Sequence, residues 1–359
     1  MAPLRVGIIY GGRSGEHDVS VVSAAWIFRH LDRSRYQPVP ILIRRDGRWV
    51  LGAEAPTALS TAEVVEPRES ATHRVTEPSA AVRDGIDVVF PVLHGPYGED
   101  GTVQGLLELA NVPYVGAGVL GSALGMDKAL AKTVFTAHGL QVVPSVTLLQ
   151  HDWDTDSSAL IARIARDLHY PVFVKPANLG SSVGISVATS DTTLSAAVGH
   201  ALEFDRKVVV EARVPNAREI ECAVLGNDEP LASIPGEVII KHRDGFYSYE
   251  AKYLDPDGAV VKIPADLSPE TTAHVRRLSV EAFRALDLAG LARVDFLLDE
   301  RSGALYLNEV NTLPGFTNIS MYPKMWEATG LAYPALLDRL ITLALERHAQ
   351  KQKKKVGRE

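Results

Sequence analysis

The sequence has very little cysteine and no long apolar run. Cys222 is the only cysteine among the 359 residues, so no internal disulfide can form and no cysteine-based metal cluster is available. No apolar stretch of about 18 residues that could cross a bilayer is found, and the opening MAPLRVGIIYGG lacks the apolar core of a signal peptide. We therefore expect a protein of the reducing cytoplasm, with no membrane association.

Excess positive charge is absent too. The 37 Lys and Arg residues against 44 Asp and Glu give a net charge of −7, which argues against a general nucleic-acid binder. The apolar share of 46% and the charged share of 23% are typical of a globular protein. A length of 359 residues predicts two or three domains.

Short β-branched runs alternate with longer helical patterns, which predicts an α/β architecture. The first third indicates an open parallel sheet, followed by two α+β units. The expected strands lie at 4–10, 39–43, 86–93, 208–214, 219–225, 231–240, 292–298 and 304–310, and the expected helices at 19–31, 102–110, 122–139, 158–169, 192–203, 269–287 and 333–348. The polar segment 52–84 is expected to be a surface loop or hairpin region.

A glycine- and serine-rich loop follows one of these apolar runs. Residues 171–186 read PVFVKPANLGSSVGIS, with Lys175 ahead of the glycines, so the G-x-x-x-x-G-K-[ST] order of a P-loop is absent. Two more lysines, Lys128 and Lys252, lie beside apolar or glycine-rich sequence. Each alone is typical of a protein surface, but together with the loop they could neutralise a triphosphate.

Carboxylates interrupt two apolar runs near the C-terminus. Asp295 lies in ARVDF, and Glu309 and Asn311 lie two positions apart in NEVNTLPG, so on a strand they point the same way. Oxygen ligands of this kind suit Mg²⁺ held jointly with substrate phosphates. The alternative interpretation is an edge strand with polar residues facing water.

Seven motifs together resemble one family. They are GGRSGEHDVS, LHGPYGEDGTVQGLLE, GSALGMDKALAK, VKPANLGSSVGIS, EAKYLD, ARVDF and NEVNTLPGFT. In this order, and over nearly the whole chain, the sequence resembles the D-alanine–D-alanine ligases of the ATP-grasp superfamily. The resemblance implies an N-terminal open parallel α/β domain at 1–116, two α+β subdomains of an ATP-grasp fold at 117–212 and 213–348 that enclose ATP, and a basic, disordered tail at 349–359.

The resemblance also implies a two-step reaction. ATP would phosphorylate the carboxylate of a first D-alanine, and the amine of a second D-alanine would displace phosphate from the acylphosphate, giving D-alanyl-D-alanine for peptidoglycan precursors. The protein would act as a homodimer and would use two Mg²⁺ ions, with Mn²⁺ as an alternative.

Roles follow from the resemblance position by position. For the amino acids, Glu16 would hold the first ammonium, with His94 nearby; Arg293 and a backbone amide near Gly315 would stabilise the oxyanion, and Ser320 would bind the second carboxylate. For the nucleotide, Lys128, Lys175, Ser182 and Lys252 would contact phosphates, Glu211 and Val214 would border the adenine, and Glu219 would bind the ribose. Asp295, Glu309 and Asn311 would bind the metal ions.

Three residues are expected to form a hydrogen-bonded trio above the reactants. The resemblance assigns this trio to Glu16, Ser181 and Tyr253, and Tyr253 favours a dipeptide over an ester product. The register near Glu219 leaves Glu221 as an alternative ribose ligand.

Three rival functions remain at this point. A Rossmann dehydrogenase is disfavoured because GGRSGEH is not G-x-G-x-x-G. A non-catalytic ATP-grasp protein should have lost Arg293 or the metal ligands. A ligase that takes D-lactate or another amino acid as its second substrate remains the nearest rival.

Overall fold

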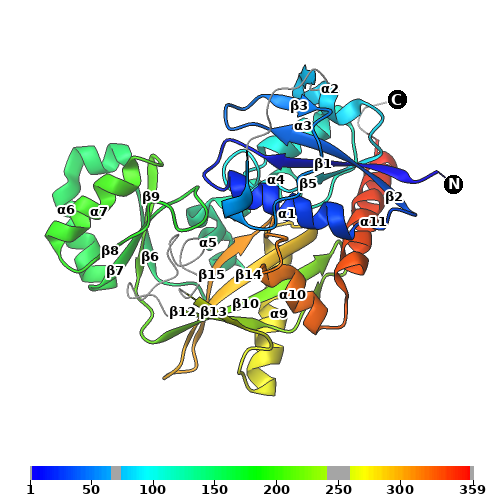
Figure 1. The fold of residues 1–359 in the computed structure, drawn as a ribbon. Coiled ribbons are helices and arrows are strands. Elements are labelled where there is room, and N and C mark those ends of the chain that lie inside the picture. The colour runs from blue at the N-terminus through cyan, green and yellow to red at the C-terminus, as the bar shows by residue number, and fades with distance from the viewer. Residues whose placement is uncertain (1, 66–73, 241–258, 356–359) are drawn as a thin grey trace.

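A computed structural model describes residues 2–65, 74–240 and 259–355, and within them three sheets form three units (Figure 1). The sheets have 5, 4 and 6 strands. The expected mixed α/β architecture with several sheets is confirmed.

The first unit carries a sheet of strand order β4-β3-β2-β1-β5. Its elements are β1 (Leu4–Gly11), α1 (His17–His30), β2 (Tyr36–Ile43), β3 (Trp49–Leu51), η1 (Thr61–Glu63), β4 (Arg74–Thr76), α2 (Pro78–Arg83), β5 (Val88–Pro91) and α3 (Thr102–Ala110). Strands β2 and β5 lie parallel to β1, but β3 is antiparallel to β2 and β4 is antiparallel to β3. The prediction of a parallel sheet is therefore wrong at one edge, because the turn between β2 and β3 is too short for a crossover connection.

The second unit is a four-stranded antiparallel sheet of order β6-β9-β7-β8. Helices α6 and α7 cover one face of it (Figure 1), with Ile164, Leu194 and Val198 in the core between them. The elements of this part are α4 (Val119–Met126), α5 (Lys128–Ala137), β6 (Ser145–Leu149), α6 (Gln150–Leu168), β7 (Val172–Pro176), β8 (Ser186–Ala188), α7 (Asp191–Leu202) and β9 (Lys207–Ala212).

The helix expected over 122–139 is two helices that meet at Asp127. The backbone of Asp127 is extended, and its carboxylate accepts hydrogen bonds from the N–H groups of Ala129 and Leu130, so it caps the start of α5. Lys128, the first residue of α5, follows directly after this break.

The third unit is an antiparallel sheet of order β13-β12-β10-β14-β15, with β11 paired to β10. Its elements are β10 (Ala217–Gly226), β11 (Leu231–Ala232), β12 (Gly236–Ile240), β13 (Ala259–Lys262), α9 (Pro269–Ala285), β14 (Gly290–Asp299), β15 (Leu305–Asn311), α10 (Met321–Ala328) and α11 (Tyr333–Gln352). The strand expected over 231–240 is thus divided into β11 and β12. Pro235 lies in the break, where its missing N–H and fixed φ prevent a continuous ladder.

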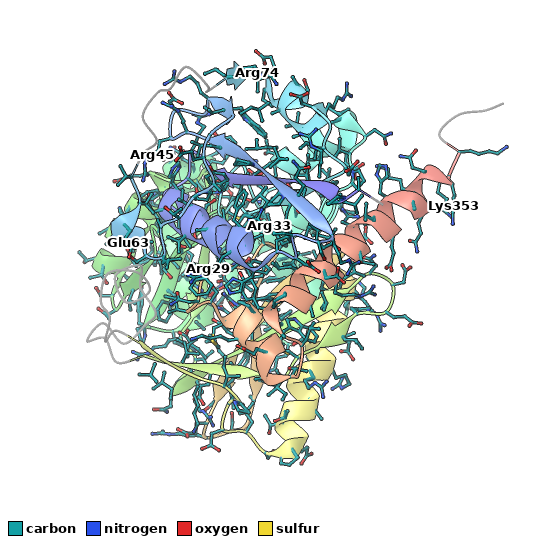
Figure 2. All side chains as sticks on the ribbon, turned by 45° about the vertical axis from the view of Figure 1, so that its right-hand side comes forward. Arg29, Arg33, Arg45, Glu63, Arg74 and Lys353 are labelled. Atoms are coloured by element: carbon teal, nitrogen blue, oxygen red, sulfur yellow. The ribbon has the colours of Figure 1, made fainter. Side chains whose placement is uncertain are left out.

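The last helix, α11, returns to the first unit and packs against its sheet (Figure 1). Leu336, Leu340 and Ile341 share one buried cluster with residues of β1 and β5. The helix continues to Gln352, four residues into the segment expected to be a disordered tail. Gln352 bonds to Asn111 and Lys351 pairs with Glu108, so contacts with α3 keep this end helical, and Figure 2 shows Lys353 just beyond it.

The described helices show whether a membrane-spanning segment is present among them. No single one combines the length and apolarity needed to cross a bilayer; only α10 and α11 taken together meet the criterion, and the pair is bent by 106°.

Candidate active site

Two adjoining cavities lie where the three units meet. The first, of about 440 Å³, is lined by α1, the loop at His94 and the segment after β15, and the second, of about 340 Å³, by β7, β9, β10 and β14. They share the lining residues Lys128, Leu179, Gly180, Ser181, Glu221, Arg293 and Glu309. A group bound in one cavity would therefore meet a group bound in the other at these side chains.

The loop after β7 forms part of the boundary between the cavities. Lys128 Nζ donates to the carbonyl of Leu179 at 2.6 Å, and Asp205 accepts from the N–H of Asn178 at 2.9 Å. Ser181 and Ser182 both have positive φ, 51° and 60°, an unusual backbone for two successive serines. Such conformations cluster at ligand-binding sites.

Glu16 connects the first unit to this loop. Its carboxylate accepts a hydrogen bond from the Ser181 hydroxyl. A Cβ at either Gly95 or Gly180 would lie 3.0 Å from Glu16 Oε2, so glycine at both positions lets two loops approach the carboxylate. Two members of the expected trio are thus in contact, while Tyr253 and Lys252 lie outside the described residues.

A buried ion-pair cluster holds Lys175 at the floor of the second cavity. Glu211 is 2.6 Å from Lys175 and 2.8 Å from Lys132, and its side chain is only 3% exposed. Burial alone would raise the pKa of Glu211, but the two ammonium groups lower it to about 2. The carboxylates of Glu211 and Glu309 in turn outweigh burial and raise the pKa of Lys175, so its charge is fixed.

Arg293 is placed between carboxylates at the boundary of the cavities. Its guanidinium donates two parallel hydrogen bonds of 2.7 Å to Asp295 and lies 3.1 Å from Glu221. Burial opposes the charged form, but Asp295 and Glu221 raise the pKa of Arg293 well above its usual value. Glu221 is thereby engaged by Arg293, whereas Glu219 lines the second cavity only.

The expected metal ligands are brought together by strand register. Asp295 is directly opposite Glu309 across β14 and β15, and Arg293 is opposite Asn311. Lys128 Nζ lies 3.4 Å from Glu309. Among the described residues, no three His, Cys, Asp or Glu side chains converge on a common point. Two carboxylates and one amide oxygen are the donor set expected where substrate phosphates complete the coordination of Mg²⁺, so these residues fit that ion.

His94 and Glu99 form the buried floor of the first cavity. His94 Nδ1 bonds to the carbonyl of Leu313 at 2.9 Å, and burial lowers the pKa of His94, so the ring is neutral. In the described part of the chain its buried Nε2 has no hydrogen-bond partner. Glu99 accepts from the N–H of Gly95 at 2.6 Å, and burial together with the charge of Glu16 raises the pKa of Glu99 to about 8.

Gly315 and Ser320 lie together on another wall of the first cavity. A Cβ at Gly315 would be 2.8 Å from Ser320 Oγ, and that hydroxyl accepts from the N–H of Thr317 at 2.9 Å. Both residues line the first cavity.

Comparison with known proteins agrees with these motifs. Residues 5–117 match the family described as the D-ala D-ala ligase N-terminus, and residues 134–342 match the D-ala D-ala ligase C-terminus. The chain belongs to the D-ala D-ala ligase family. A D-alanine–D-alanine ligase of Solibacter usitatus is 50% identical, over 97% of this chain and 98% of the relative.

Solved structures of the family superpose over nearly the whole chain. The D-alanine–D-alanine ligase from Coxiella burnetii is 39% identical with a TM-score of 0.82, covering 98% of this chain and 97% of its own. The VanG D-Ala:D-Ser ligase from Enterococcus faecalis is 35% identical with the same TM-score of 0.82, covering 95% of this chain and 99% of its own.

The family resemblance in the sequence named the residues expected to bind substrates and metal ions, but it assigned no role to Glu99 or Lys132. Glu99 lies within LHGPYGEDG, and an acid in a glycine-rich loop is a recognisable signal of a functional site. Lys132 lies four positions after Lys128 on the same helix, a spacing that predicts a shared face. The sequence alone reveals neither the ion pair of Lys132 with Glu211 nor the approach of Glu99 to Glu16, because both depend on how distant segments pack together.

Proposed function

We propose that the protein is an ATP-dependent ligase that joins two D-alanines into D-alanyl-D-alanine for peptidoglycan precursors. The observation that carries this proposal is the pair of cavities that share Arg293, Lys128 and Glu309 at their boundary. Phosphoryl transfer between two bound substrates needs such a boundary, where cations and metal ligands meet both reactants.

The second cavity would hold ATP between the second and third units. Lys175, Lys128 and Ser182 would bind its phosphates, the chain from Glu211 to Val214 would border the adenine, and Glu219 would bind the ribose. The carboxylate of Glu211 is occupied by two lysines, so its side chain would act by fixing Lys175. Asp295, Glu309 and Asn311 would hold two Mg²⁺ ions, which would supply charge neutralisation at the transferring phosphoryl group. Lys252, from outside the described residues, would add a further cation.

The first cavity would hold both amino acids. Glu16 would bind the ammonium of the first D-alanine, beside the neutral His94. One carboxylate oxygen of that D-alanine attacks the γ-phosphorus, and ADP leaves. Ser320 would hold the carboxylate of the second D-alanine, whose amine then attacks the activated carbonyl carbon.

Charge that develops during this attack must be stabilised where it forms. Arg293, with a backbone amide near Gly315, would face the oxyanion of the tetrahedral intermediate. Phosphate then leaves, and the amine loses its proton as the peptide bond forms. Ser181, fixed by Glu16, would orient the reactants, and Tyr253 would complete the trio.

The proposed domain boundaries are 1–116, 117–212 and 213–348, with α5 packed on α9 of the third domain and α11 packed on the first. We expect a homodimer, which sedimentation at several protein concentrations would test. Dependence on ATP favours the cytoplasm as the place of action.

The decisive experiment measures ATP-dependent phosphate release with D-alanine, L-alanine, D-serine or D-lactate supplied alone. In a second series, L-alanine, D-serine and D-lactate are each mixed with D-alanine. Release with D-alanine alone, and D-alanyl-D-alanine identified by mass spectrometry, would support the proposal. Release with L-alanine but not with D-alanine would refute it. D-serine is included because the structure of a D-Ala:D-Ser ligase superposes on this chain, and a mixed product in excess of the D-alanine dimer would reassign the acceptor.

A further inference from the structure

Part of the segment expected to be a surface loop or hairpin region contributes to the first cavity. Leu59, Ser60 and Thr61, at the start of η1, line it together with Val19 and Val22 of α1. Figure 2 shows Glu63, at the end of η1, beside α1, and the two elements are in contact. These lining residues therefore approach the cavity from the side of the first unit.

The turn that carries these residues is held in one conformation. Glu63 accepts hydrogen bonds from the N–H of Leu59 at 3.0 Å and from the Ser60 hydroxyl at 2.9 Å. After the turn, Val64 packs against the core that contains α1. Before the turn, the hydroxyl of Tyr10 donates a hydrogen bond to the carbonyl of Glu54 at 3.3 Å. These contacts on both sides of the turn hold Leu59, Ser60 and Thr61 in place in the wall of the first cavity.

The turn lies at the open rim of the cavity rather than at its floor. Leu59 is 38% exposed and Ile319 is 61% exposed, whereas His94 and Glu99 are 5% and 6% exposed. Ile319 is adjacent in sequence to Ser320, the proposed anchor of the second carboxylate. The rim is thus the acceptor end of the cavity, and the buried floor by Glu16 is the donor end.

We propose that Leu59 and Thr61 limit the size of the acceptor side chain, and that the turn at 59–63 is a determinant of acceptor specificity. This inference rests on the ligase function proposed above. An acceptor held by Ser320 would carry its side chain towards this rim, where a longer side chain would meet Leu59 or Thr61 in a turn that is anchored on both sides. One methylene in such a pocket changes kcat/KM by about 10-fold or more.

The test measures acceptor choice in a mixture of D-alanine and D-2-aminobutyrate, which has one more methylene. Mass spectrometry gives the ratio of D-alanyl-D-2-aminobutyrate to D-alanyl-D-alanine for the wild type, for Leu59→Ala and for Thr61→Trp. We expect Leu59→Ala to raise the ratio by about 10-fold and Thr61→Trp to lower it, with the KM for ATP unchanged in both. Leu231→Ala, at an exposed leucine on β11 away from both cavities, is the matched control and should leave the ratio unchanged.

The outcomes separate this inference from the function on which it rests. A wild type that makes no dipeptide would refute both. A wild type that makes D-alanyl-D-alanine, with ratios within twofold in Leu59→Ala and Thr61→Trp, would overturn the role of the turn alone. Because the two substitutions change the rim in opposite directions, a general loss of folding cannot imitate the expected pair of results.

Discussion

The carboxylate of Glu16 accepts a hydrogen bond from the hydroxyl of Ser181, although 165 positions separate the two residues in the chain. The bond joins the start of α1 to the loop after β7. Ser181→Ala should lower kcat for D-alanyl-D-alanine formation by about 100-fold, because a small displacement of reacting groups has effects of that size. Ser182→Ala, next to it, should mainly raise the KM for ATP. Steady-state kinetics with each substrate varied would distinguish them, and equal effects on kcat would contradict the orienting role of Ser181.

Arg293 offers a second test through its bidentate pair with Asp295. Arg293→Lys retains the positive charge but loses the planar fork, so we expect kcat to fall by about 100- to 1,000-fold, the typical cost of losing one oxyanion donor. Arg218 makes an equivalent pair with Glu237, with two bonds of 2.7 Å, and lines neither cavity. Arg218→Lys is therefore the control. Similar losses of kcat in both variants would show that Arg293 is only structural.

Glu99 should make stability depend on pH in an unusual direction. Burial, with the nearby charge of Glu16, raises its pKa from 4.5 to about 8, so the folded protein keeps a proton that the unfolded chain releases. The free energy of unfolding should therefore fall as pH rises from about 5 towards 8. Glu99→Gln, which stays neutral, should remove this part of the slope, as urea unfolding at a series of pH values would show.

The control for Glu99 is Glu281→Gln, at a partly exposed position on α9. Its pH profile should follow that of the wild type. A Glu99→Gln profile with the wild-type slope would mean that Glu99 is ionised in the folded protein at neutral pH.

The buried cluster around Glu211 should contribute strongly to stability. Lys132→Met removes one of two ammonium groups from a buried carboxylate, and should lower the free energy of unfolding by about 3 kcal/mol, as for other broken buried pairs. Arg277→Met breaks the exposed pair with Glu281 and should cost about 0.5 kcal/mol or less. Denaturant unfolding of both variants would test this, and equal costs would argue against a special role for the buried pair.

Much of the candidate site was predictable because its residues lie in short, locally distinctive strings. The glycine-rich turn before Glu16, the loop at Ser181 and the alternation around Glu309 each indicate a strand end or a loop without knowledge of the fold. Apolar periodicity, however, does not reveal a backbone break within a continuous pattern, so the division at Asp127 was missed, although aspartate is a favoured N-cap residue.

Contacts between distant segments could not be predicted from the sequence. The pairing of Glu211 with Lys132 depends on a sheet placed against a helix, and no local pattern encodes that distance. The contribution of Leu59 to a cavity wall depends likewise on how η1 packs on α1. The sequence alone could not decide between Glu219 and Glu221 as the ribose ligand. In the structure both side chains lie on one face of β10, and Glu221 contacts Arg293.

The position of α11 has a consequence for how the chain is made. Tyr36 donates to Asp338 at 2.5 Å across 302 positions, and leucines of α11 complete the core against β1 and β5. When the first 116 residues have left the ribosome, their sheet still lacks α11, the helix that covers it. The first unit must therefore wait, with apolar surface open to chaperones or to other nascent chains, until α11 has been synthesised. A premature stop before Tyr333 would therefore destabilise the first unit, because its sheet would lose the packing of α11.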